Sequence, residues 1–372
     1  MAASKGIIKT ALRLLLLVPL ALLVLWVNYF VDQTGLFRGG KYELELAGIL
    51  MQGDPVSNFD QMDERQVLKL YIKSMPQSYD TLVIGSSRGL QITAAIAGET
   101  GSFYNAGMSG EDFYDIMGTV SLLDKYDRLP KNLILVLDPW ILNDNEESYS
   151  KRSDANLANE FLTNTLGFDE PYEDNAKNQY TDALFDLDYF QKNVAYYFED
   201  HSNESQPARV TGDVYEQDTP TKMPDGTLLY EKEYREWTQA DVDWEAQTIA
   251  NIPFPFGCYD YPKLNEKRCA EFTALVAFLQ QKGVNLTFVL SPFHPIVYAS
   301  AIKYEERAGI ALSETFFADI AQKNDIPFYG SYDPAKAGCT SADFYDGLHI
   351  KRGSISKYFP GIQAAATAGT ES

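Results

Sequence analysis

The sequence predicts an α/β fold built on a mostly parallel sheet. Short apolar segments typical of buried strands alternate with longer segments whose apolar residues recur every three to four positions, as on one face of a helix. Leu82–Ile84 and Asn285–Leu290 are clear strands, and Glu111–Lys125 and Asn265–Lys282 are clear helices. Strands that alternate with helices predict parallel pairing, with helices on both faces of the sheet.

Other segments complete this pattern along the chain. In order, we expect a connector helix over Asp63–Met75, a strand over Asn132–Leu137, an amphipathic helix over Tyr189–Phe198, an Asp-Gly turn and short strand within Pro224–Tyr230, and a last strand over Asp325–Tyr329. The long stretch between the two halves of the core is acidic and rich in aromatic residues. A structureless loop of that length is improbable in a compact domain, so we expect an inserted cap or lid.

The expected organisation follows from these segments. Residues 33–77 form a membrane-proximal connector, and 78–142 together with 263–360 form the core. Residues 143–262 form the cap over the carboxyl ends of the strands, where open α/β sheets bind ligands. Residues 361–372 form a flexible tail.

An apolar run near the N-terminus predicts a membrane anchor. The residues before it include three basic and no acidic ones, namely Lys5, Lys9 and Arg13. With its flanks, the run Leu14–Phe30 reaches about 18–20 residues, enough to cross the hydrocarbon core of a bilayer. A cleaved signal peptide shares these features, but no small-x-small cleavage site follows the run. We therefore expect residues 1–32 to form a cytoplasmic tip and a single-pass transmembrane signal anchor.

The charges around this run predict its orientation. Basic residues before the run and Asp32 after it favour a cytoplasmic N-terminus, and Trp26, Tyr29 and Phe30 are typical of an interfacial aromatic belt. The remainder of the chain then faces outward, as a periplasmic or extracellular domain.

Composition narrows the classes of partner. The 372-residue chain has a formal net charge of −21, which argues against nucleic acid or an anionic membrane face as a partner. Its three cysteines show no C-x-x-C or Cys/His ligand spacing, so a structural zinc site is not expected. An oxidising compartment permits one disulfide. Cys258–Cys269 is the local candidate, and the sequence leaves the pairing with Cys339 open.

Two polar turns at opposite ends of the predicted core contain the side chains of a Ser-His-Asp site. Gly85-Ser86-Ser87 follows the first strand, and Asp346 and His349 lie three residues apart, so that one loop can position both. A serine hydroxyl becomes a good nucleophile when a base takes its proton and a third group orients that base. We therefore predict Ser87 as the nucleophile, His349 as the base and Asp346 as the orienting acid.

Two known arrangements place a serine in such a turn. The stretch Gly85–Gly89 fits the G-x-S-x-G elbow of α/β-hydrolases, but several strands precede the elbow in that fold, and its acid and base sit on separate loops. The early serine and the late D-x-x-H resemble the SGNH (GDSL-like) hydrolase family instead. The Gly-Ser-Ser turn, with Ser86 in place of Asp, is similar to the membrane-anchored DltD/AlgJ-type proteins of cell-envelope O-acylation.

Two further blocks bear on this resemblance. Ser102–Gly110 resembles the second block of the family, which implies that the N–H groups of Gly110 and Ser87 receive the oxyanion. In the third block the family places an Asn just after its strand. This chain has Asp138-Pro139-Trp140 there, and Asn143 comes three residues late. The resemblance implies a flavodoxin-like three-layer SGNH fold with no metal or organic cofactor.

The resemblance also implies a function. We expect a membrane-anchored, extracytoplasmic acyl-ester hydrolase or O-acyltransferase that acts on a cell-envelope or exported polysaccharide. The alternative is a catalytically weak envelope assembly subunit that partners a membrane-bound O-acyltransferase. A module that only binds carbohydrate would leave the Ser-His-Asp set unexplained.

Three residues near the predicted site are candidates for substrate binding. Trp140 offers a wall on which a sugar ring could stack, and His294 follows a strand that ends at the same edge of the sheet. Arg88 could form a basic patch with Lys351 and Arg352.

Overall fold

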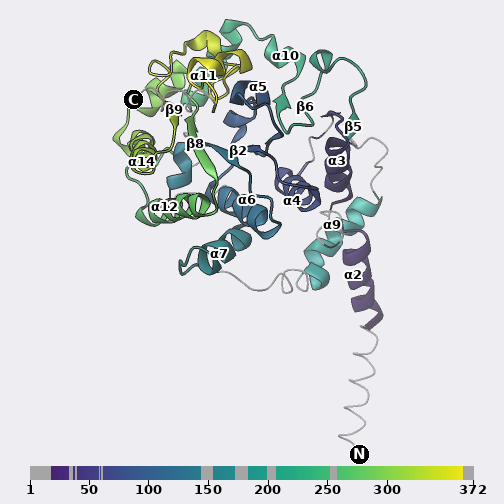
Figure 1. Cartoon of the computed structure of the whole chain (residues 1–372). Coiled ribbons are helices and arrows are strands. Elements are labelled where there is room, and N and C mark those ends of the chain that lie inside the picture. The colour runs from purple at the N-terminus through teal and green to yellow at the C-terminus, as the bar shows by residue number, and fades with distance from the viewer. Residues whose placement is uncertain are drawn as a thin grey trace, which may run out of the picture. The chain divides into compact units, whose positions relative to one another are not determined.

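The computed structural model describes residues 18–32, 37, 40–57, 59, 62–143, 154–171, 183–198, 207–251 and 258–362 (Figure 1). The chain divides into two compact units. The first takes residues 1–45 and 173–206, and the second takes residues 46–172 and 207–372. The predicted cap, 143–262, is therefore not one body, because its middle part groups with the N-terminal segment.

The first unit contains α2 (Val18–Phe30) and α9 (Leu187–Phe198), which confirms the helix expected over 189–198. Asn28 and Asn193 are fully buried, and the amide of Asn193 donates to Asn28 Oδ1 at 3.2 Å. The hydroxyl of Tyr189 donates to Asp32 Oδ1 at 2.8 Å. These polar contacts join α9 to α2.

The predicted membrane anchor is described only in part. α2 covers the last 13 residues of the apolar run, and residues 1–17 lie outside the described ranges. Within those ranges, the structure contains no helix that combines the length and the apolar character needed to cross a membrane. The anchor therefore stays a prediction.

The second unit is built on a five-stranded sheet in the order β3-β2-β4-β8-β9, and every neighbouring pair is parallel. This confirms the mixed α/β class and the parallel sheet. The strands are β2 (Thr81–Gly85), β3 (Phe103–Asn105), β4 (Asn132–Val136), β8 (Asn285–Leu290) and β9 (Phe328–Gly330).

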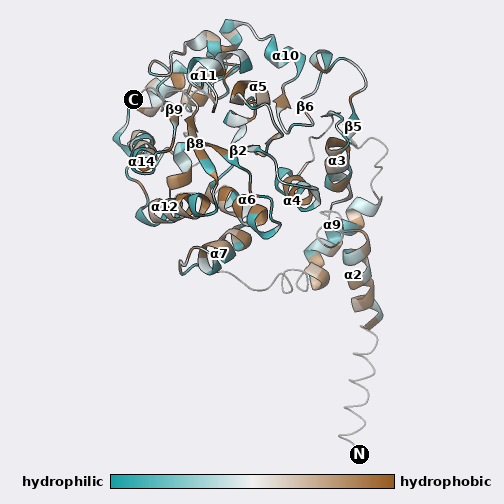
Figure 2. Ribbon diagram, in the orientation of Figure 1, coloured by the Kyte–Doolittle hydropathy of each residue, from teal (hydrophilic) through white to brown (hydrophobic). Residues whose placement is uncertain are grey.

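Both faces of this sheet are buried, as the nearly continuous apolar strands predict. On one face, Val83, Val136 and Val289 pack against Phe344 and neighbouring apolar residues of the C-terminal segment. On the other face, the ring of Phe288 lies 5.9 Å from that of Phe272 in α12 (Glu266–Gln281). In Figure 2, β8 is largely hydrophobic, whereas α6 (Phe113–Lys125) and α12 carry hydrophobic and hydrophilic residues side by side, as amphipathic helices do.

The remaining helices are α3 (Lys41–Met51), α4 (Glu64–Ser74), α5 (Ala94–Ala97), α6 (Phe113–Lys125), α7 (Ala155–Asn164), α10 (Lys232–Arg235), α11 (Gln239–Asn251), α12 (Glu266–Gln281), α13 (Pro295–Ala301) and α14 (Gly309–Lys323). Side chains cap the N-termini of α4 and α6, the two helices that matter most for the site. Asp63 caps α4, and Asp112 and Asp115 form a reciprocal capping box at α6.

A second, antiparallel sheet was missed by the sequence analysis. Its order is β5-β1-β6-β7, with β1 (Val56–Ser57), β5 (Ala208–Arg209), β6 (Thr221–Lys222) and β7 (Leu228–Leu229). It joins the predicted connector to residues 207–229 of the predicted cap. The Asp225-Gly226 turn before β7 was expected, and Gly226 has the left-handed φ of +80° that such a turn requires.

None of the three cysteines forms a disulfide, so the Cys258–Cys269 bridge that the sequence permits is absent.

Candidate active site

The nucleophile turn follows β2 directly. Gly85 approaches β4 so closely that a Cβ there would lie 2.6 Å from Val136 Cβ, which only glycine avoids. Ser86 is buried, and its Oγ accepts a hydrogen bond from the Arg88 N–H at 3.2 Å. Ser86 therefore caps the short 3₁₀ turn Ser87–Gly89, and Ser87 is the residue that presents its hydroxyl.

The structure brings the three predicted catalytic side chains together. His349 Nε2 lies 2.8 Å from Ser87 Oγ, and His349 Nδ1 lies 2.7 Å from Asp346 Oδ2. These distances meet the geometric requirement for a nucleophile, a base and an orienting acid. The side chains of His349 and Asp346 are 19% and 11% exposed, so the site is sheltered yet open to solvent.

The carboxylate of Asp346 is held by four donors. Its Oδ1 accepts from the N–H groups of Leu348 at 2.6 Å and His349 at 2.7 Å, and its Oδ2 accepts from Tyr234 and the His349 ring. Burial raises the pKa of Asp346, but His349 and the donated hydrogen bonds outweigh it and hold the pKa well below its usual range. An ionised carboxylate only accepts, so in the neutral imidazole Nδ1 carries the proton and Nε2 is free to accept from Ser87.

Tyr234 is a member of the site that the sequence analysis missed. It comes from α10, in the predicted cap, and its hydroxyl donates to Asp346 Oδ2 at 2.5 Å. Burial and the nearby carboxylate raise its pKa, so the phenol keeps its proton and stays a donor. No motif marks Tyr234, because its role depends on a contact with a residue 112 positions away.

Aromatic rings surround this contact. The Tyr234 ring stacks on Tyr345 at 5.7 Å between centroids and meets Trp237 edge-on at 4.8 Å. The ring of Tyr230 lies 5.8 Å from the imidazole of His349. The cap segment thus supplies aromatic side chains to the wall of the site as well as a hydrogen bond to its acid.

We expect Tyr234→Phe to lower kcat about 3-fold to 10-fold, because it removes one hydrogen bond to a charged group but leaves the ring packing intact. Steady-state kinetics with p-nitrophenyl acetate measure this change. The matched control is Tyr298→Phe, which removes a hydroxyl from a helix outside the site. An unchanged kcat in Tyr234→Phe would show that three donors suffice for Asp346.

The predicted oxyanion loop lies beside the nucleophile turn. After β3, the N–H groups of Ala106 and Met108 donate to Val83 O at 2.8 Å and Gly85 O at 3.0 Å, which aligns the loop with the end of β2. Gly110 has a left-handed φ of +58°. Among the described residues, the N–H of Gly110 and that of Ser87 donate no hydrogen bond. Two unpaired backbone donors near a nucleophile can receive an oxyanion.

The three side chains predicted to bind substrate are buried and make contacts within the protein, and their contact with substrate stays a prediction. Arg88, Trp140 and His294 are 2%, 1% and 0% exposed. Arg88 pairs with Asp138 at 2.6 Å, and the Trp140 indole N–H donates to Glu111 O at 2.9 Å.

His294 also has a supporting role. Its ring Nδ1 accepts from the Ile296 N–H at 3.2 Å and so caps α13. The backbone N–H of His294 donates to Gly347 O at 3.1 Å. It therefore holds the loop that contains Asp346 and His349.

The expected basic patch is not formed. Besides the burial of Arg88, Arg352 donates to Gln91 Oε1 at 3.2 Å and Leu228 O at 3.1 Å, and Lys351 donates to Ala342 O at 3.0 Å. These cations fix loops in place. Asn143, the late candidate for the third block, is buried at the end of the 3₁₀ turn Pro139–Leu142.

Comparison with models of known protein families finds no match, and no curated protein is detectably similar to the chain. In the described part of the chain, no three His, Cys, Asp or Glu side chains are grouped so as to hold a metal ion.

Proposed function

We propose that the chain is an SGNH-like serine acyl-ester hydrolase or O-acyltransferase. The contact series Ser87–His349–Asp346 is the observation that carries this proposal. The position of the site in the sheet supports it. Counted along the chain, the parallel strands follow the order 2-1-3-4-5 of flavodoxin-like sheets, and Ser87 follows β2 at the point where the direction of winding reverses. Ligands of such sheets bind at this switch point.

In the proposed reaction, Ser87 Oγ attacks the acyl carbonyl while His349 Nε2 takes the hydroxyl proton. A C–O bond forms, and the carbonyl π electrons move to the oxygen, which the N–H groups of Ser87 and Gly110 stabilise. Collapse of this intermediate breaks the bond to the alcohol, which leaves with the proton from His349. Water or a sugar hydroxyl then attacks the acyl-serine, and His349 again takes and returns the proton. Asp346 stabilises the imidazolium in both halves.

By resemblance, we propose an extracytoplasmic, membrane-anchored protein whose substrate or acceptor is a cell-envelope or exported polysaccharide. One feature favours a second candidate, an assembly subunit that partners a membrane-bound O-acyltransferase. The third block has no Asn at the family's position, and the residue there, Trp140, is buried with its indole N–H donating to Glu111 O. An oxyanion hole with fewer donors makes a slower enzyme.

A fluorophosphonate probe separates the two candidates, because it captures serines that a neighbouring base activates. We expect the wild-type chain in detergent to be labelled and Ser87→Ala to remain unlabelled. The control Ser300→Ala should label like the wild type. A wild type that resists labelling would favour the assembly subunit. Candidate oligosaccharides added to an assay with a small acyl donor then distinguish transfer from hydrolysis.

A further inference from the structure

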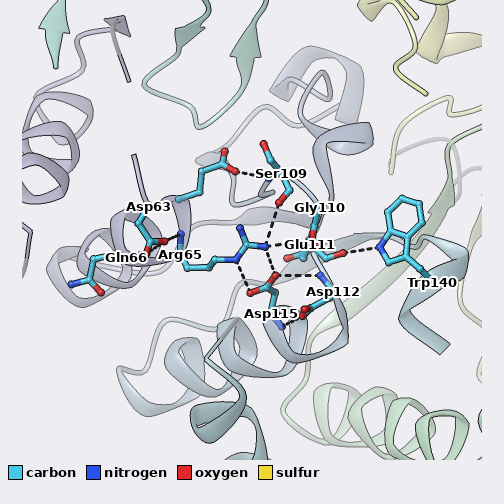
Figure 3. A network of polar contacts seen from close by, with 10 residues as sticks. Asp63, Arg65, Gln66, Ser109, Gly110, Glu111, Asp112, Asp115 and Trp140 are labelled. Atoms are coloured by element: carbon cyan, nitrogen blue, oxygen red, sulfur yellow. Dashed lines mark hydrogen bonds and ion pairs between the residues drawn. The ribbon is translucent and has the colours of Figure 1, made fainter. Parts of the chain in front are cut away.

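The backbone between Ser109 and Gly110 is held by two side chains of α4 (Figure 3). The N–H of Ser109 donates to Glu64 Oε2 at 2.6 Å. Nη2 of Arg65 donates to Ser109 O at 3.3 Å and to Gly110 O at 3.4 Å. Asp63 caps the helix through the N–H of Arg65, so both side chains extend from a fixed first turn.

The next residue of the loop is held from other directions. The N–H of Glu111 donates to Met108 O at 3.2 Å, and its carbonyl accepts from the Trp140 indole at 2.9 Å. Within the tripeptide Ser109–Glu111, the N–H of Gly110 is then the one backbone polar group with no partner among the described residues. A tripeptide whose other backbone polar groups are all satisfied has a single backbone donor left for a ligand.

Arg65 is itself fixed by a second contact. Its Nε and Nη2 bind Asp115 Oδ1 and Oδ2 at 3.1 and 2.6 Å, and the two side chains are 14% and 2% exposed. This two-point contact sets the plane of the guanidinium. Asp115 Oδ2 also accepts from the Asp112 N–H at 3.2 Å, so the same carboxylate fixes the start of α6.

The neighbouring acid does not compete for Arg65. Burial raises the pKa of the Glu111 carboxyl well above its usual range, and Asp115 raises it further. The carboxyl of Glu111 makes no hydrogen bond to Arg65, whereas Asp115 binds the guanidinium at two points.

Planarity of the peptide links Arg65 to the oxyanion donor. The carbonyl of Ser109 and the N–H of Gly110 belong to one trans peptide, in which the two groups point in opposite directions. When Arg65 holds Ser109 O on one side, the N–H of Gly110 must point to the other. Glycine with a positive φ would otherwise let this peptide rotate at little cost.

We propose that Arg65, held by Asp115, is a positioning residue that aims the Gly110 N–H at the oxyanion. The inference rests on the proposed function and deepens it. The segment predicted as a connector, residues 33–77, becomes part of the catalytic apparatus through α4. Donation to Ser109 O also polarises the peptide, which makes the Gly110 N–H a stronger donor.

Arg65→Gln tests this proposal in the full chain. We expect kcat for p-nitrophenyl acetate to fall about 10-fold to 100-fold with little change in KM, because a misdirected donor is lost only from the transition state. The kcat of Arg65→Lys should lie between those of the wild type and Arg65→Gln. An ammonium group keeps the charge but cannot bind the loop and both oxygens of Asp115 at once in the planar geometry of a guanidinium. The matched control is Arg268→Gln, which breaks a similarly buried pair of Arg268 with Glu271 (11% and 0% exposed) and a hydrogen bond to the Tyr114 hydroxyl.

Hydrogen exchange of the amides of Ser109 and Glu111, both hydrogen-bonded in the wild type, gives a readout that needs no activity. We expect faster exchange in Arg65→Gln and wild-type exchange in Arg268→Gln. If the wild type neither hydrolyses esters nor is labelled by the fluorophosphonate probe, the proposed function fails. The exchange measurement still tests whether Arg65 holds the Ser109–Gly110 peptide. Wild-type kcat and exchange in Arg65→Gln would overturn the inference. So would equal losses of kcat in Arg65→Gln and Arg268→Gln, which would indicate general destabilisation.

Discussion

Replacing Ser87 or His349 by alanine is expected to lower kcat for a small acetyl ester by about 10⁴-fold to 10⁶-fold. In the proposed mechanism Ser87 supplies the attacking oxygen, and His349, 2.8 Å away, is the only base in contact with it among the described residues. Asp346→Asn should be milder by about 10-fold to 100-fold, because an orienting group contributes less than the nucleophile or base. Steady-state kinetics of the purified chains measure each loss.

The losses of kcat in the two alanine variants should not be additive. Either one alone removes the covalent route, so the double variant Ser87→Ala/His349→Ala should retain the same residual rate as the singles. Ser300→Ala serves as the control, since its hydroxyl donates to Ala250 O outside the site. Wild-type turnover in Ser87→Ala would exclude the covalent mechanism.

The parts of the site that sequence reasoning found share one property: each lies in a short local pattern. Ser87 follows an apolar strand through a Gly-Ser turn, and Asp346 and His349 lie in one loop, so their chemistry is visible within a few residues. The parallel sheet was predictable for the same reason, because its strands are apolar runs separated by helical periods.

What the sequence did not show depends on contacts between distant segments. Tyr234 reaches Asp346 from α10, and Arg65 reaches the oxyanion loop from α4, yet neither lies in a motif. The strands of the antiparallel sheet have two residues each, too few to show a period of two.

Arg88 shows a different limit. A charged residue beside a catalytic serine suggested contact with a substrate, because arginine is seldom fully buried. The acid that permits its burial, Asp138, lies 50 positions further along the chain. The side chains of the pair are 1% and 2% exposed, and Arg88 also donates to Ser291 O and stacks on the Phe293 ring at 3.9 Å.

This burial makes Arg88→Met the variant with the largest expected effect on stability. Removing the guanidinium leaves the carboxylate of Asp138 buried without its counterion, and burial already raises the pKa of Asp138 while Arg88 lowers it. We expect the free energy of unfolding to fall by about 3–5 kcal/mol, measured by chemical denaturation of the full chain in detergent. The double variant Arg88→Met/Asp138→Leu should recover most of this loss, because two apolar side chains need no charge partner.

The same variants decide between a structural role and substrate binding. If Arg88 has a structural role under the nucleophile turn and does not contact substrate, the folded double variant Arg88→Met/Asp138→Leu should have a KM for small esters near that of the wild type. If Arg88 contacts substrate, Arg88→Met should raise KM while leaving the denaturation midpoint unchanged, and the double variant should not restore binding. The 2% exposure of Arg88 favours the first result, because a side chain so enclosed reaches a ligand only by breaking its contacts with Asp138 and Ser291.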